Sequence, residues 1–109
     1  MILFEEFKKI DIRIGKIVEA QQLENVQYVT HKLIIDLGEL GKKVSFVNIK
    51  KYKNDQLLQK LVICVINLPV KKIGKELSEV LLLGTPDKDG ECILLEPDSS
   101  DAIVGNSVY

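Results

Sequence analysis

Apolar and polar residues alternate along much of this chain, which is the pattern of half-buried β-strands. The clearest alternation covers residues 11–21, where Ile12, Ile14, Val18 and Ala20 fall on one side of an extended chain. Residues 31–38 and 43–49 predict a second and a third strand. The unbroken apolar run in 61–68 predicts a central fourth strand, covered on both faces. Residues 77–84 predict a fifth strand and 91–95 a short sixth.

Two short helices and two extensions complete the pattern. Residues 4–10 place Phe4 and Phe7 on one side of a helix, and residues 54–59 predict a helix capped by Asn54. A helix of one or two turns is not stable alone, so the aromatic face must pack on its own domain or on a second subunit. Gly15 stands where a bulge or sharp coil is useful in the first strand. Residues 97–109 read as an irregular tail that retains apolar side chains.

The order of these elements is three strands, a short helix and then two more strands. That is the order of the OB-fold, a five-stranded Greek-key barrel that binds oligonucleotides and other extended ligands on one face. Other small barrels stay open as alternatives. We therefore predict a mainly β chain with a single domain over residues 1–109, a helical extension at 1–10 and a tail at 97–109.

Composition agrees with a β-rich soluble domain. The chain is 46% apolar and has no tryptophan, so its core must come from Val, Ile and Leu, which favour strands. The longest apolar run, residues 61–66, is too short to cross a membrane. The first residues lack the basic start and long apolar core of a signal peptide. We expect a cytoplasmic protein without membrane insertion.

Charge is distributed unevenly, although the net charge is only -1. Residues 42–75 hold nine lysines and one acid, whereas residues 76–109 hold eight acids and one lysine. A basic segment beside an acidic one indicates an anion-attracting patch, a self-association surface, or both. The acidic third could lie on another face, pair with the basic segment of a partner subunit, or repel RNA.

Catalytic and metal-binding chemistry finds little support in the sequence. Cys64 and Cys92 each lie in an apolar run and are expected to be buried, reduced thiols, unless their strands are neighbours and form a disulfide. His31 is the single histidine and has no Ser-His-Asp or Cys-His arrangement around it, so we expect a strand-edge histidine. We predict that the chain is not an enzyme and needs no metal or cofactor.

Several motifs resemble one known family. Residues 7–20, Phe-Lys-Lys-Ile-Asp-Ile-Arg-Ile-Gly-Lys-Ile-Val-Glu-Ala, resemble the opening motif of the tRNA-binding domain family. That family includes the C-terminal appendage of methionyl-tRNA synthetases and free-standing tRNA-binding proteins. Residues 62–68, 94–98 and above all 78–84, Ser-Glu-Val-Leu-Leu-Leu-Gly, resemble its CsaA branch of export-related chaperones.

The resemblance implies a homodimeric OB-fold without catalytic activity, whose dimer is built from the N- and C-terminal additions. CsaA-like proteins bind exposed segments of precursor proteins and assist export, and the wider family binds tRNA through a basic face. The chain departs from the pattern on the expected ligand face. Tyr28 and Val29 stand where CsaA-like sequences carry a basic residue and proline, and Phe46 replaces the second of two adjacent serines.

Candidate ligand residues come from the third strand and the basic loops. Lysines clustered on a turn attract phosphates or acidic side chains, although they also suit a merely solvated loop. Ser45 and Asn48 match the family's polar positions, and Phe46 is either an exposed apolar contact or core filler. Asn67 either pins a loop or contacts ligand. The predicted peptide- or RNA-binding residues are Ser45, Phe46, Asn48, Lys50, Asn67, Lys71 and Lys72.

Other candidates have more ordinary interpretations. Tyr52, flanked by lysines, could stack on a base, but packing under the short helix is favoured. Arg13 could bind an anion, but a structural pair with Glu79 or another strand acid is favoured. Apolar residues in the two extensions either cap the barrel ends or, as the resemblance implies, form a dimer interface: Phe4, Phe7, Ile10, Ile103, Val104 and Val108.

Two hypotheses follow. The first is a homodimeric CsaA-like chaperone that holds short, extended, apolar or partly basic segments of unfolded or precursor proteins. The second is a tRNA-binding module that contacts phosphates through Lys50, Lys51, Lys71 and Lys72. The pI of about 5.8 argues against a dedicated nucleic-acid binder, and the basic segment argues for one.

Overall fold

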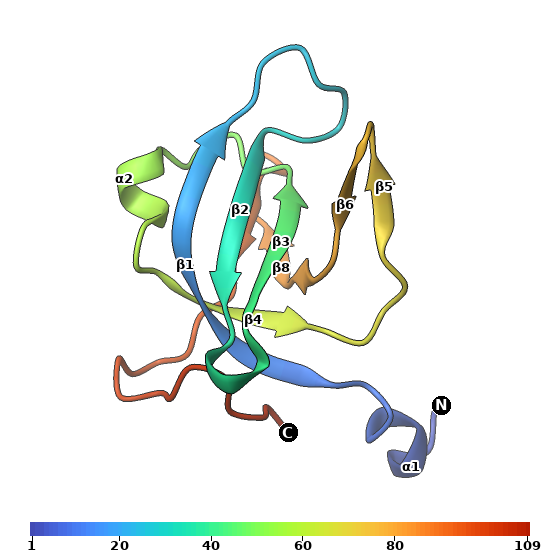
Figure 1. Cartoon of the computed structure of the whole chain (residues 1–109). Helices are drawn as coiled ribbons and strands as arrows, with labels where there is room; N and C mark the ends of the chain where they lie inside the picture. Colours follow the sequence, from blue (N-terminus) through green and yellow to red (C-terminus); the bar gives the residue numbers. More distant parts are fainter.

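The computed structural model describes all residues, 1–109. Its centre is an antiparallel sheet in the order β3–β2–β1–β4–β7, curled into a nearly closed barrel (Figure 1). The five strands are β1 (Ile12–Gln22), β2 (His31–Asp36), β3 (Lys42–Val47), β4 (Leu61–Val65) and β7 (Leu81–Leu82). The predicted mainly β OB-fold, with a short helix between the third and fourth strands, is confirmed.

Strand β1 belongs to two ladders. Its first half pairs with β4 and its second half with β2, and the register shifts between Ile17 and Glu19. The prediction of a bulge at Gly15 was therefore wrong. Gly15 serves close packing instead, because a Cβ there would lie 2.5 Å from Ile35 Cγ2 and 3.0 Å from Cys64 Sγ.

The predicted fifth strand is divided into three short pieces. They are β6 (Glu76–Ser78), β7 and β8 (Gly84–Pro86). β6 belongs to one hairpin, β7 adds a strand to the barrel sheet, and β8 begins a second hairpin. β8 pairs with β9 (Cys92–Leu94), which confirms a short strand there. β6 pairs with β5 (Lys71–Ile73), so the segment predicted as a basic loop is a hairpin. Gly74 begins its turn with φ 61°, a value that glycine adopts without strain.

Eleven buried residues form the core inside the barrel, and Ile17, Leu33 and Ile35 are fully enclosed. The helix α2 (Asn54–Leu57) inserts Leu57, which is also fully buried. It is two residues shorter than predicted, and Lys53 rather than Asn54 is its N-cap, with Lys53 N–H donating to Gln56 Oε1 (2.8 Å). No helix in the chain has both the length and the apolar character needed to cross a membrane.

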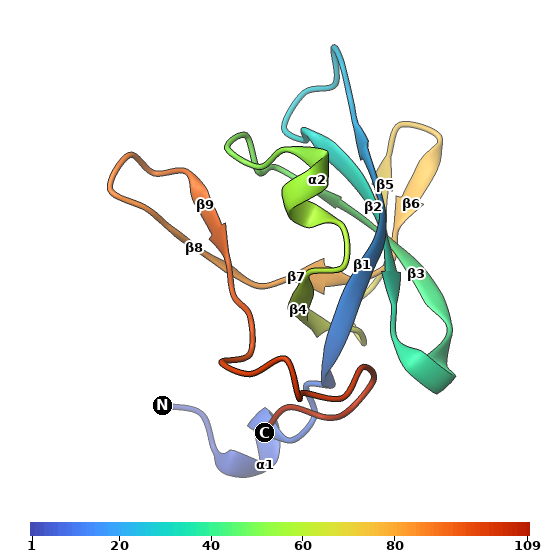
Figure 2. The same cartoon turned by 90° about the vertical axis from the view of Figure 1, so that its left-hand side faces the viewer.

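The two ends of the chain meet at one end of the barrel, as Figure 2 shows. The helix α1 (Phe4–Phe7) ends three residues earlier than predicted and stands away from the sheet. The tail was expected to be irregular, but its last part runs along β1. Gly105 N–H donates to the Ile14 carbonyl (2.7 Å), and Val108 N–H donates to the Ile12 carbonyl (2.8 Å). The turn η1 (Gly38–Leu40) lies against this tail.

Candidate functional site

A groove follows the outer edge of β3, where the barrel is least tightly closed. Its first hollow, of about 220 Å³, lies between Phe46 on β3 and Leu81 on β7, with Lys71 at its margin. A second hollow, of about 350 Å³, is lined by apolar residues that include Leu40 and Val70. The two hollows share three lining residues, Leu68, Glu79 and Val80, so we treat them together as the β3 groove.

The register of β3 decides which of its side chains face this groove. Ser45 is buried, and its hydroxyl donates to the Val80 carbonyl (2.8 Å). This bond gives Ser45 a structural role, because it holds β3 to the segment before β7, and a ligand role of Ser45 stays a prediction. Because neighbouring side chains of a strand point to opposite faces, Phe46 points outward and is half-buried in the groove. Phe46 is therefore not core filler, and its contact with a ligand stays a prediction.

The lysines of the β5–β6 hairpin point in two directions. Lys71 lies opposite Ser78 and lines the groove, whereas Lys72 lies opposite Leu77 on the other face of the hairpin. Neither lysine has an acidic partner within ion-pair distance. Asn48 and Lys50 are exposed beyond the end of β3 and do not line the groove. The groove thus brings together Ser45, Phe46 and Lys71, but not Asn48, Lys50, Asn67 or Lys72.

Three of the nine lysines in the basic segment form ion pairs with the acidic third of the same chain. Lys51 Nζ lies 2.6 Å from Asp87 Oδ2 and 3.2 Å from Asp89 Oδ2. These hydrogen bonds raise the pKa of Lys51, and the one from Lys51 lowers the pKa of Asp87. Similar pairs join Lys60 to Glu96 (2.7 Å), Lys43 to Glu79 (3.9 Å) and Lys32 to Glu76. The basic segment keeps six lysines without such partners: Lys42, Lys50, Lys53, Lys71, Lys72 and Lys75.

Tyr52, in contrast, is part of the core. Its ring packs against the buried cluster, and its hydroxyl accepts a hydrogen bond from Leu94 N–H (3.1 Å). The favoured packing of Tyr52 is confirmed. The ring is half-buried in this position, which favours a packing role over stacking on a base.

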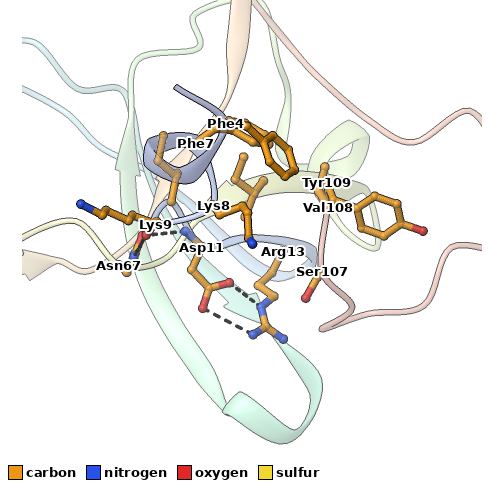
Figure 3. Close-up of a pocket in the computed structure, with 12 residues that line it drawn as sticks. Phe4, Phe7, Lys8, Lys9, Asp11, Arg13, Asn67, Ser107, Val108 and Tyr109 are labelled. Carbon is orange, nitrogen blue, oxygen red and sulfur yellow. Dashed lines mark hydrogen bonds and ion pairs between the residues drawn. The ribbon is translucent and has the colours of Figure 1, made fainter. Parts of the chain in front are cut away.

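A second surface lies at the chain ends (Figure 3). Asn67 connects β4 to the segment before β1, since its Oδ1 accepts from Asp11 N–H (2.9 Å) and its Nδ2 donates to the Lys9 carbonyl (2.7 Å). The pinning role of Asn67 is observed, although the segment that it pins is not its own loop. Arg13 Nε donates to Asp11 Oδ1 (2.6 Å), and Arg13 Nη1 donates to the Gly105 carbonyl (3.0 Å). The favoured structural pair of Arg13 is confirmed, with Asp11 rather than Glu79 as the partner.

Apolar side chains of both ends surround a hollow of about 390 Å³ at this place. Of the predicted interface residues, Phe4, Ile10 and Ile103 are 70%, 42% and 64% exposed, whereas Phe7, Val104 and Val108 are half-buried. Met1, Ile2, Leu3 and Tyr109 are also exposed and were missed by sequence reasoning. We call this apolar area, formed by α1, Ile10 and residues 103–109, the terminal surface.

Comparison with known proteins assigns the chain to a family. The sequence profile described as "Putative tRNA binding domain" matches residues 12–106. The chain belongs to the tRNA-binding domain family. Within this family it is similar to CsaA: a crystal structure of CsaA chaperone protein from Picrophilus torridus matches with a TM-score of 0.90 and 39% identity over the whole of both chains. Chaperone CsaA from Bacillus anthracis matches with a TM-score of 0.87 and 34% identity, over 100% of this chain and 99% of that one. The predicted CsaA-like membership of the family is thereby confirmed.

Curated relatives of the tRNA-binding domain family include much longer proteins. Methionine--tRNA ligase of Methanothrix thermoacetophila is 36% identical over 99 residues, which are 90% of this chain and 14% of the ligase. The ligase of Francisella tularensis is 41% identical over 95 residues, 86% of this chain and 14% of the ligase. The chain therefore spans about a seventh of the length of these relatives.

The remaining candidates, two cysteines and the single histidine, are buried or half-buried. Cys64 is buried and Cys92 half-buried, both as free thiols, and burial raises the pKa of Cys64 to about 12. His31 is not a surface strand-edge residue, because it is buried at the start of the inner strand β2. Its Nδ1 lies 2.8 Å from Thr30 Oγ1, its Nε2 has no partner, and burial lowers its pKa. No group of three or more His, Cys, Asp or Glu side chains could hold a metal ion.

Sequence reasoning missed the apolar part of the groove. Leu68, Val70 and Leu81 are each about half exposed, yet they were read as strand or loop residues without a ligand role. Leu68 and Val70 flank a proline, so they lie where the β4 strand cannot continue. The available signal for an exposed apolar surface was one apolar residue on each side of a proline, just after a strand.

Proposed function

We propose that this chain is a CsaA-like chaperone that captures exposed segments of unfolded or precursor proteins and assists their export from the cytoplasm. The observation that carries this proposal is the β3 groove, an open and largely apolar hollow with Lys71 at its margin. The likeness to two CsaA structures over the full chain supports it.

The exposure of apolar side chains in the groove favours a polypeptide ligand. Leu68 is 47% exposed, Val70 56% and Leu81 48%, and each of them lines at least one of the two adjoining hollows. Contiguous apolar area on a soluble domain marks a surface that binds another molecule. An unfolded protein offers apolar side chains in an extended chain, and shallow contacts of this kind give the weak, reversible binding that a chaperone needs.

The proposed chaperone acts as a homodimer joined through the terminal surface. The exposed side chains of Phe4, Ile10 and Tyr109 line one hollow on that surface, which a second copy would remove from water. A dimer would carry two β3 grooves. Two weak sites on one particle hold a long unfolded chain more tightly than either site alone.

A second function, binding of structured tRNA, is favoured by membership of the tRNA-binding domain family and by the unpaired lysines. Lys50, Lys71 and Lys72 would contact phosphates, and the neighbouring Lys42, Lys53 and Lys75 would add to the field. Lys51 contributes less than the sequence suggested, because Asp87 and Asp89 hold its ammonium group.

A salt titration separates the two functions. Binding of bulk tRNA and of a reduced, alkylated protein that cannot refold would be measured for the wild-type chain, for Lys71→Ala/Lys72→Ala and for Lys51→Ala as the control. Binding through phosphates loses roughly 0.7 to 0.9 log units of affinity per neutralised phosphate for each log unit of salt. Apolar capture of the unfolded protein is expected to depend little on salt.

Retained capture of the unfolded protein, with no tRNA binding at physiological salt, supports the chaperone proposal. Tight and steeply salt-dependent tRNA binding that is lost in the double variant and kept in Lys51→Ala supports the RNA function. A wild-type chain that captures no unfolded protein at any salt concentration overturns the chaperone proposal.

A further inference from the structure

The outer edge of β3 carries two backbone N–H groups whose hydrogen bonds end on side chains. Val44 N–H donates to Glu79 Oε1 (3.0 Å), and Phe46 N–H donates to Ser78 Oγ (3.0 Å). In a regular sheet such groups donate to the carbonyls of a neighbouring strand. Because β3 is the last strand in its sheet, these oxygens occupy the places that the carbonyls of a further strand would take.

The two N–H groups have the spacing of an edge that can pair with a strand. Residues two apart in a strand direct their backbone groups to the same side, and Val44 and Phe46 are two such residues. The Val44 carbonyl already accepts the backbone N–H of Glu79 on this side (2.8 Å). An extended polypeptide beside Phe46 presents carbonyl and N–H groups at the required spacing, whereas a helix uses these groups internally.

Little prevents the Ser78 hydroxyl from giving up its position. Ser78 ends β6, whose only strand partner is β5, and this hairpin stands beside the barrel (Figure 1). The ion pair between Glu76 of the hairpin and Lys32 of β2 is partly exposed, so it adds little to the attachment. The residues after Ser78 stay attached, because Glu79 N–H and Val80 N–H both donate to the Val44 carbonyl (2.8 and 3.4 Å). Only the end of the hairpin at Ser78 has to shift, and Phe46 N–H then exchanges one acceptor for another.

The groove next to this edge suits the side chains of an added strand. Alternate side chains of a strand lie on one face, so two of them can enter two adjoining hollows. The first hollow has Phe46 and Leu81 in its wall, and the second has Leu40 and Val70. Lys71 lines the first hollow, Lys43 lines the second, and Glu79 lines both. Acidic side chains of a ligand could therefore pair with either lysine, and basic side chains with Glu79.

We propose that a client segment binds by adding a strand to the outer edge of β3 beside Phe46, where one of its carbonyls replaces the Ser78 hydroxyl as the acceptor of Phe46 N–H, while Glu79 keeps its bonds to Val44. This inference rests on the proposed chaperone function and deepens it. It defines the ligand as an extended polypeptide segment with apolar residues at alternate positions, recognised through its backbone as well as its side chains.

The test uses a labelled synthetic peptide in which apolar residues alternate with serine and threonine. Ser78→Ala removes the competing acceptor from Phe46, so the variant should bind the peptide about two- to tenfold more tightly than the wild-type chain. Ser100→Ala is the matched control, since Ser100 is exposed and lies outside both the groove and the terminal surface. A scan of the peptide with N-methylated residues should weaken binding about tenfold or more at alternate positions only, because each methyl group removes a donor and blocks pairing.

The outcomes separate this inference from the function on which it rests. Peptide capture that ignores both Ser78→Ala and N-methylation overturns strand addition and leaves the chaperone proposal standing. Failure of the wild-type chain to capture peptide or unfolded protein overturns both. If Ser78→Ala changes only the sedimentation of the chain alone, the edge pairs with a second copy and strand addition by a client is wrong.

Discussion

The β3 groove and the terminal surface are both apolar and exposed, but they are held in place differently. The terminal surface is fixed by backbone bonds from Gly105 and Val108 to β1, by Asn67, and by Arg13. At the groove, Val44 makes the only backbone–backbone bonds between β3 and the opposite segment, and side chains of Ser78 and Glu79 make further contacts.

The way in which each surface is attached to the barrel indicates whether it suits a lasting or a reversible contact. A surface fixed from several directions loses little further freedom on association and suits a lasting interface. A surface joined largely through side-chain hydrogen bonds, here those of Ser45, Ser78 and Glu79, opens locally more easily and suits ligands that must come and go. The two apolar areas of this chain thus favour different lifetimes of binding.

The largest expected change in stability comes from comparing a glycine substitution in the tail with one in the β5–β6 hairpin. Gly105 has φ 91°, and a Cβ there would lie 2.6 Å from the Leu37 carbonyl oxygen, whereas Gly74 has φ 61° and nothing within 4 Å. Gly105→Ala should lower the free energy of unfolding by about 2–4 kcal/mol, through strain and collision. Gly74→Ala should cost only the backbone strain, about 1 kcal/mol. Urea denaturation measures both, and equal losses would contradict the firmer attachment of the tail.

A pair of phenylalanine truncations separates the functions of the two surfaces. Phe4→Ala should weaken the proposed dimer by about 2 kcal/mol, since exposed aromatic residues dominate interfaces. Stability of the monomer should stay almost unchanged, because Phe4 is 70% exposed. Phe46→Ala should reduce peptide capture and leave association unaffected. Sedimentation equilibrium and peptide titration check the pair, and a wild-type chain that sediments as a monomer would refute the dimer.

The smallest effect concerns the acid sensitivity of the groove side. His31 is buried opposite Val47, which lines the groove, and burial lowers its pKa from 6.5, so protonation favours the unfolded chain. Above about pH 6.5 this contribution is constant. Below it the unfolded chain binds a proton that the folded chain does not, and stability falls by at most about 1.4 kcal/mol per pH unit until the folded pKa is reached.

The control for this effect is His31→Gln, which removes the titrating group. Denaturation between about pH 5.5 and 7.5, where few other side chains titrate, should show a slope for the wild-type chain and almost none for the variant. Equal slopes for both chains would assign the acid sensitivity to other groups.

The sequence predicted the barrel well and the groove only in part. The first four strands were found within three residues at each end, because alternation or a long apolar run marks them. The β5 strand was missed because three residues, two of them lysine, show no periodicity. A period of two cannot say which face is inside, so Ser45 and Phe46 could not be assigned before the register was known. The pairing of Lys51 with Asp87 depends on topology, since the two residues lie far apart in sequence.

The dual pairing of β1 has a consequence for how the chain reaches its native state. The β1–β3 meander consists of contacts between segments that follow one another, so it can assemble early. The β4 ladder and the tail both join the first half of β1 across long stretches of chain. During synthesis, the first half of β1 stays unpaired, with its apolar face exposed, until β4 and the tail have been made. We therefore expect docking of β4 onto β1 to limit the folding rate, and the chain to be most prone to aggregation before that step.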